Sequence, residues 1–178
     1  AAQLAGGVFE RCDFHGADLS GATLQESVLT ECNLRGAKLR GIDLRHVTLN
    51  KCDLSGADLE RAMFLQCVLN GADLAGCTVA RTSFESVDFG PAKLAAFDLR
   101  AATLIRCGFI GADLAGMDLR GVPLEECNFR LANLTRANLS ECKLARANFD
   151  AADLTDARLV KAQAKGGYFG KATLHRTR

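Results

Sequence analysis

Every fifth residue of the chain is leucine or phenylalanine, from Leu4 to Leu174, without a break in register. The 35 positions hold 24 Leu and 9 Phe, with Val79 and Ala164 as the two exceptions. The residue two places earlier is small, most often Ala or Cys. Because a fixed period along a whole chain marks a repeat architecture, this register constrains the fold more than any other property of the sequence.

A period of five fits neither an α-helix nor a flat strand. A helix turns through about 500° in five residues, so successive Leu and Phe side chains would spread around its axis. Side chains of a strand alternate between two faces, so a step of five would place successive Leu or Phe residues on opposite faces. The period fits if each five-residue unit forms one side of a coil and the chain bends between sides. The Leu or Phe and the small residue then both point inward, and stacked coils bury one core.

The other positions of the unit are typical of corners. The residue before the Leu or Phe is Asp in eleven units and Asn in five, and the last residue is Gly in twelve. Asp and Asn side chains bond to nearby backbone, and Gly tolerates unusual dihedral angles. Segments such as GADLSGATLQ (16–25), SGADLERAMF (55–64) and RLANLTRANL (130–139) match the motif A-(D/N)-L-X-X. In these segments the chain resembles the pentapeptide-repeat family. The resemblance implies an all-β fold, a right-handed quadrilateral β-helix with four units per coil and about nine coils.

The length of the chain and its unbroken repeat favour a single domain. The repeat covers residues 1–178 without a linker, so we expect a single β-helix domain. The chain starts without Met and stops within the pattern at Arg178, which leaves open that it is excised from a longer protein.

With 22 Lys and Arg against 21 Asp and Glu, the net charge is +1, and nucleic acid is not an expected partner. No apolar run reaches the roughly 20 residues that a membrane-spanning helix needs.

All eight cysteines occupy the small inward position of the unit, and none has the C-x-x-C spacing of zinc sites. They are Cys12, Cys32, Cys52, Cys67, Cys77, Cys107, Cys127 and Cys142. We expect them all to be buried, reduced core residues rather than disulfides or metal ligands. Unpaired thiols favour a reducing compartment, hence the cytoplasm.

The sequence indicates no catalytic site and no cofactor or metal. Outward Asp residues would be neighbours in adjacent coils, as Asp53 with Asp73 and Asp98 with Asp118. Paired carboxylates can act in acid–base catalysis, but these recur as a motif position and are interpreted as corner residues. The protein is therefore expected not to be an enzyme.

Four departures from the repeat stand out, because irregularities in a regular design point to function. Phe97 and Met117 replace the small inward residue and must widen the coil or displace neighbours. Pro123 takes the Asp/Asn position, and Pro91 follows Gly90 at what would be an ordinary corner. Near the end, Ala164 replaces a Leu, and the core is expected to thin there.

Some apolar residues occupy positions that the repeat otherwise gives to polar groups. This candidate interaction patch consists of Met63, Leu65, Val68, Ile105, Ile110 and Leu131. Four of them fall on two adjoining faces of a four-sided coil, within about two coils. A contiguous exposed apolar patch would indicate an interface.

Two functions remain open at this point. The first is a rigid, non-enzymatic scaffold that mediates protein–protein interaction or self-association, as a module of a larger bacterial protein, for example one associated with secretion. The alternative, implied by the resemblance, is a DNA mimic that binds a topoisomerase (gyrase), as in the quinolone-resistance group of the family. This chain departs from that group in its neutral charge, its uninterrupted register and its basic, glycine-containing end. Neither hypothesis names the partner.

Overall fold

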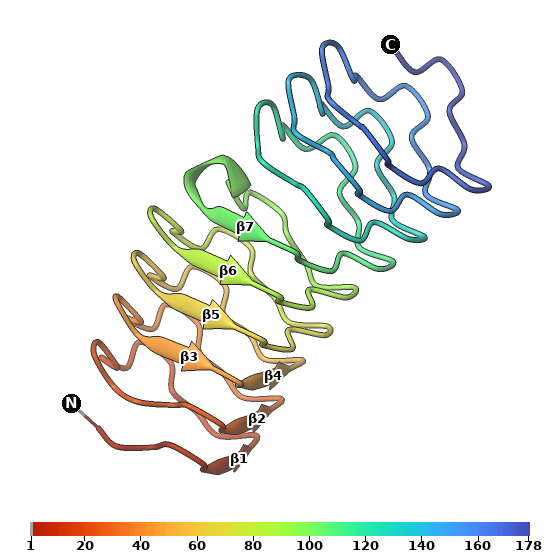
Figure 1. The fold of residues 1–178 in the computed structure, drawn as a ribbon. Helices are drawn as coiled ribbons and strands as arrows, with labels where there is room; N and C mark the ends of the chain where they lie inside the picture. Colours follow the sequence, from red (N-terminus) through yellow and green to blue (C-terminus); the bar gives the residue numbers. More distant parts are fainter. Residues whose placement is uncertain (1) are drawn as a thin grey trace.

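The computed structural model describes residues 2–178, which wind into a β-solenoid (Figure 1). Paired residues of adjacent coils are 20 positions apart and parallel, for example Val8 with Val28 and Phe64 with Phe84. Four five-residue units therefore make one coil, as the family resemblance implied. Among the described residues no helix is long and apolar enough to cross a membrane.

The described residues form seven short strands and one helical turn. The elements are β1 (Val8–Glu10), β2 (Val28–Thr30), β3 (Asp43–Arg45), β4 (Thr48–Asn50), β5 (Met63–Leu65), β6 (Ser83–Glu85), the 3₁₀ turn η1 (Leu99–Ala101) and β7 (Thr103–Ile105). They build two parallel sheets, in the orders β1-β2-β4 and β3-β5-β6-β7. These strands lie within about five 20-residue periods, between Val8 and Ile105. Beyond them the ladder continues as isolated bridges such as Asn128 with Asn148.

The Leu and Phe positions fill the interior together with the small residues two places earlier. One cluster of buried side chains extends from Leu19 to Ala157. Identical positions of successive coils stack directly, and the rings of Phe109 and Phe129 lie parallel with centroids 5.2 Å apart. The same stack continues through Phe149 to Phe169. The inward assignment of the repeat is thereby confirmed.

The corner position has a positive φ in almost every unit, whether or not it is glycine. Besides the glycines, 21 other residues adopt it, among them Arg61 at φ 61° and Arg136 at φ 59°. A left-handed conformation costs such residues roughly 1–2 kcal/mol, so the ladder and the core must impose it. Between residues 6 and 176 the two corner positions without a positive φ are Pro91 and Ala101.

Seven of the eight cysteines are buried, and the expectation that all eight would be is wrong for Cys12. Cys12 is half-buried because it lies in the first described coil and is covered on one side only. Six of the seven buried thiols donate to a carbonyl 23 residues earlier, for example Cys77 Sγ to Leu54 O at 3.0 Å. Ser27 Oγ donates to Leu4 O in the same way, at 2.9 Å. The inward position therefore accepts small donors as readily as alanine.

Candidate functional site

The six residues of the candidate interaction patch all point away from the core. Met63 and Leu131 are about half exposed, at 49% and 51%, and Ile105 and Ile110 are exposed at 38% and 39%. Leu65 and Val68 are half-buried. At each of these positions about half of the apolar surface or less is open to solvent.

The strand register separates the apolar side chains of this patch from one another. Leu65 pairs with Glu85, and Glu85 pairs in turn with Ile105, so a carboxylate stands between the two apolar residues. The Glu85 carboxylate is 2.6 Å from Arg106. Val68 likewise pairs with Asp88. The patch is therefore a mixed surface in which apolar residues alternate with acidic ones.

A second feature of the surface is an interruption of the parallel ladder after residue 90. Residues 73 and 93 are bridged, and so are residues 113 and 133. Among the described residues, however, Lys93 does not bridge Asp113, and Asp98 does not bridge Asp118. The predicted neighbours Asp98 and Asp118 are therefore not paired in the ladder. Figure 1 shows the coil that carries η1 and β7 standing apart from the coil that follows it.

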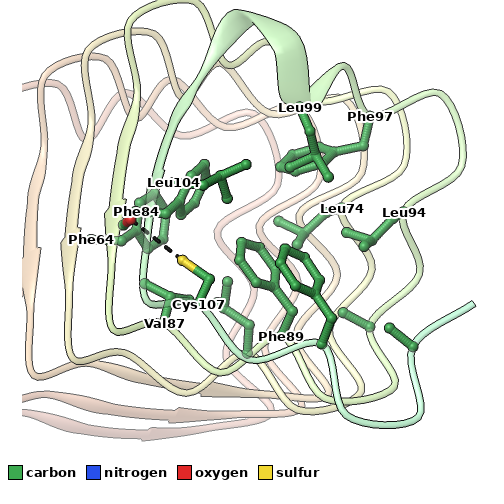
Figure 2. Close-up of a cluster of buried hydrophobic side chains, with 14 of the residues drawn as sticks. Phe64, Leu74, Phe84, Val87, Phe89, Leu94, Phe97, Leu99, Leu104 and Cys107 are labelled. Atoms are coloured by element: carbon green, nitrogen blue, oxygen red, sulfur yellow. Dashed lines mark hydrogen bonds between the residues drawn. The ribbon is translucent and has the colours of Figure 1, made fainter. Parts of the chain in front are cut away.

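Local sequence explains why the ladder opens here. Pro91 cannot adopt a positive φ, so Gly90 takes one instead, at φ 42°, and the corner moves by one residue. Phe97 stands where the repeat has a small residue, and its ring packs 6.1 Å from the Phe84 ring and 6.4 Å from the Phe89 ring. Figure 2 shows these three rings within one cluster of buried side chains. Because the Phe97 ring takes up interior space, the backbone around it is displaced from the regular path into η1.

The two coils enclose an open cavity of about 770 Å³ between residues 91–100 and 111–118. We call this cavity the opening. Its lining includes the apolar residues Pro91, Leu94, Phe97 and Met117.

Arg100 spans the opening. Its guanidinium lies 2.9 Å from the Asp98 carboxylate in its own coil and 2.8 Å from the Asp118 carboxylate in the next. The hydrogen bond from Arg100 lowers the pKa of Asp98, and that of Asp118 is lowered chiefly by a hydrogen bond from the Arg120 backbone. Both carboxylates are therefore ionised at neutral pH, and Arg100 bridges the two coils electrostatically.

Several backbone amides at the two edges of the opening lack the carbonyl acceptors that such amides have in regular coils. In regular coils the amide of a central Leu donates to the next coil, as Leu74 N does to Lys93 O at 2.9 Å. The amides of Leu94 and Ala96 on one edge make no such bond within residues 2–178. Those of Asp113 and Asp118 on the other edge make none either. Edge amides and carbonyls of this kind are templates for pairing with another chain.

The sequence identified the residues of this site but not the site itself. Phe97, Met117 and Pro91 were recognised as departures, with a wider coil or displaced neighbours as the expected consequence for Phe97 and Met117, and all three line the opening. Pro123, another of these departures, is bridged to Lys143 but not to Thr103 among residues 2–178, so it extends the interruption beyond β7. The available signal was the clustering of these departures within residues 90–123.

Within residues 2–178 no three His, Cys, Asp or Glu side chains gather as metal ligands. Burial raises the pKa of Cys52, Cys77 and Cys127 to about 12, so these thiols stay protonated and unreactive at neutral pH.

Comparison with known families shows where the repeat is regular. The model for pentapeptide repeats matches residues 1–30, 12–50, 27–64 and 52–90, and that for a pentapeptide repeat region matches residues 102–178. These matches leave out residues 91–101, the first edge of the opening. A search of curated proteins gave no match.

Solved structures with a similar fold include full-length QnrB1, described as a plasmid-mediated fluoroquinolone resistance protein. It has a TM-score of 0.72 and 18% identity, over 93% of this chain and 91% of that one. A trypsin-treated QnrB1 variant has a TM-score of 0.66 and 20% identity, over 94% and 89% of the two chains. A pentapeptide repeat protein from the Arabidopsis thaliana thylakoid lumen has a TM-score of 0.53 and 21% identity, over 58% and 75%. At these identities the matches establish the fold alone.

Proposed function

Because the chain belongs to the pentapeptide-repeat family, we propose that it is a non-enzymatic, rigid β-helical scaffold that mediates protein–protein interaction. The observation that carries the proposal is the exposure of Met63, Ile105, Ile110 and Leu131 on a rod whose other outward positions are mainly polar. An interface that forms and dissociates is on the whole about as apolar as the rest of a protein surface, so a mixed surface of this kind is compatible with one. The partner is another protein or a second copy of the chain.

The rigidity of the rod supports this role. Its core is continuous, and each coil is bonded to the next along most of its length, as Leu134 N is to Asp153 O at 2.8 Å. A rod of this kind holds distant surface positions at fixed separations, which reduces the entropy lost when a partner binds.

The substitution Leu65→Glu combined with Ile105→Glu tests the proposal. Neither side chain belongs to the buried core, so the fold should survive, while added charge beside Glu85 should abolish partner capture or self-association. A matched control is Ala75→Glu with Thr135→Glu, which adds the same charge at outward positions elsewhere on the rod. Light scattering and affinity capture provide the readouts. Identical binding by wild type and the Leu65/Ile105 variant would refute a role for this surface.

DNA mimicry remains the second candidate, and the charge distribution does not favour it. A mimic of duplex DNA needs a long negative face. Residues 20 positions apart are bridged in successive coils and form rows along the rod. The row with Asp53 and Asp73 continues to Lys93, and the row with Asp18 and Asp58 is interrupted by Lys38. Within residues 2–178 neither row is continuously acidic.

The proposed location is a reducing compartment such as a bacterial cytoplasm. Eight free cysteines, seven of them buried, support it, since oxidising compartments favour disulfides. The origin in a larger, secretion-associated bacterial protein is supported by the family resemblance alone.

A further inference from the structure

The two edges of the opening present backbone hydrogen-bonding groups without partners, as the edges of an incomplete β-ladder do. One edge presents the amides of Leu94 and Ala96, and the other presents those of Asp113 and Asp118, all without a hydrogen-bond acceptor in residues 2–178. On the same edges no backbone amide of residues 2–178 donates to the carbonyls of Ala92, Asp113 and Ala115, whereas Phe97 O accepts from Leu99 N at 3.1 Å. An extended polypeptide offers alternating donors and acceptors at strand spacing, which is the basis of recognition by strand addition.

The walls of the opening suit side chains that alternate along such a segment. Met117 is half-buried in its apolar wall, and Leu94 and Phe97 lie behind this wall with only 3% and 2% of their surface exposed. Successive side chains of an added strand would point alternately toward these residues and toward solvent.

The charges of the opening select a basic segment. Its lining holds three Asp residues against Lys93 and Arg100. Lys93 is 3.1 Å from the Asp73 carboxylate, and Arg100 is bonded to Asp98 and Asp118. Asp113 accepts hydrogen bonds from Asn133 Nδ2 and from the Ala115 amide, but no ion pair joins it to a cation among residues 2–178. Its charge is therefore available to a lysine or arginine of the occupant.

From these observations we infer that the opening binds an extended, basic segment of a partner protein, which adds to the interrupted ladder as an additional strand. The inference rests on the proposed function for its premise that the rod binds protein, and it names a surface separate from the Leu65/Ile105 region. Main-chain bonds would supply affinity, and the Asp residues would supply selectivity for cations.

A synthetic peptide tests the inference on the whole chain. The probe has the sequence of residues 34–41, LRGAKLRG, a stretch of this repeat with three cationic residues and no acidic ones. Calorimetry should show saturable binding, and hydrogen exchange should show slower exchange at Leu94, Ala96 and Asp113, which lie along one side of the coil before the corner at Gly116. Two control peptides, one with its cations changed to Glu and one N-methylated at alternate amides, should not bind.

Protein variants test whether the peptide binds in the opening and not elsewhere on the rod. Asp113→Asn keeps the hydrogen-bonding side chain but removes its charge, and should weaken peptide binding about two- to five-fold. Asp153→Asn, at the equivalent position of a bridged coil, should leave affinity unchanged. Phe97→Ala with Met117→Ala restores the small residues of the repeat, should close the ladder and should abolish binding.

Three results would overturn the inference: no saturable binding of the peptide, binding without slower exchange of the Leu94, Ala96 and Asp113 amides, or association of two copies through the opening in place of peptide binding. The Leu65→Glu and Ile105→Glu variant should still bind the peptide. Failure of the peptide experiment with intact partner capture at the Leu65/Ile105 region would refute the inference and leave the proposed function standing.

Discussion

Truncation of one buried leucine, compared with one exposed leucine three residues away, measures the inward assignment directly. Leu134 has no exposed surface, and its counterparts Leu114 and Leu154 in the adjacent coils are equally buried. Backbone bonds fix all three coils at this point, so the walls around a new cavity cannot collapse. Leu134→Ala should therefore cost about 3–5 kcal/mol, the upper part of the range for buried leucines.

Leu131→Ala removes the same atoms at a corner where the side chain is 51% exposed, and should cost less than about 0.5 kcal/mol. Urea denaturation followed by far-UV circular dichroism measures both. With a slope of about 2–3 kcal/mol per molar urea, the midpoint should fall by roughly 1–2.5 M for Leu134→Ala and barely change for Leu131→Ala. Fluorescence of Tyr168, the one tyrosine, checks that the last coil unfolds in the same transition. Equal shifts for the two variants would refute the inward and outward assignment.

Three further predictions concern the corner, the aromatic stack and the thiols. Gly56→Ala should cost about 1 kcal/mol through backbone strain alone, since φ is 66° and an added Cβ meets nothing within 4 Å; an unchanged melting temperature would contradict this. Phe129→Leu loses ring contacts at 5.2 and 5.0 Å and should cost about 1–3 kcal/mol in urea denaturation; a loss below about 0.5 kcal/mol, the size of a surface effect, would show that the stack contributes little. Burial raises the pKa of Cys52 to about 12 and of Cys107 to about 11, so the unfolded thiols ionise first as pH rises above about 9. The free energy of unfolding should then fall between about pH 9 and 11, and less steeply in Cys52→Ala; identical pH profiles would contradict the assignment.

The coil was predictable because a single property, the period of five, determines it. Each unit places one large and one small residue inward, and no other regular structure buries both at that spacing. Four units per coil followed from the family resemblance and is confirmed by pairs such as Phe64 with Phe84.

The corners were only half predictable. Twelve corner glycines indicate the left-handed conformation, but Arg61 and Arg136 adopt it as well, against their intrinsic preference. A residue type indicates only which backbone conformation that residue prefers locally. At these corners the hydrogen bonds between stacked coils impose the positive φ. The same limitation applies to Cys12, whose residue type indicates burial but whose position in the first described coil leaves it half-exposed.

The opening could not be derived from the sequence, although its residues could be singled out. An oversized Phe97 is compatible with a wider coil, a shifted neighbour or a broken ladder, and the sequence does not decide among these. The outcome depends on Pro91, which moves the corner, and on the rings of Phe84 and Phe89, which hold Phe97 inside. Similarly, the apolar residues Leu65 and Ile105 are separated by Glu85, a consequence of the 20-residue register.

Amide hydrogen exchange of the free protein is the most direct test of the interrupted ladder. The amides of Leu94, Ala96, Asp113 and Asp118 should exchange rapidly, because no backbone carbonyl accepts from them within the described residues. The amides of Leu114 and Gly116, which donate to Asn133 O and Thr135 O at 2.8 Å, should be strongly protected. Equal protection of the two sets would mean that the ladder is closed, and the opening would lose its basis.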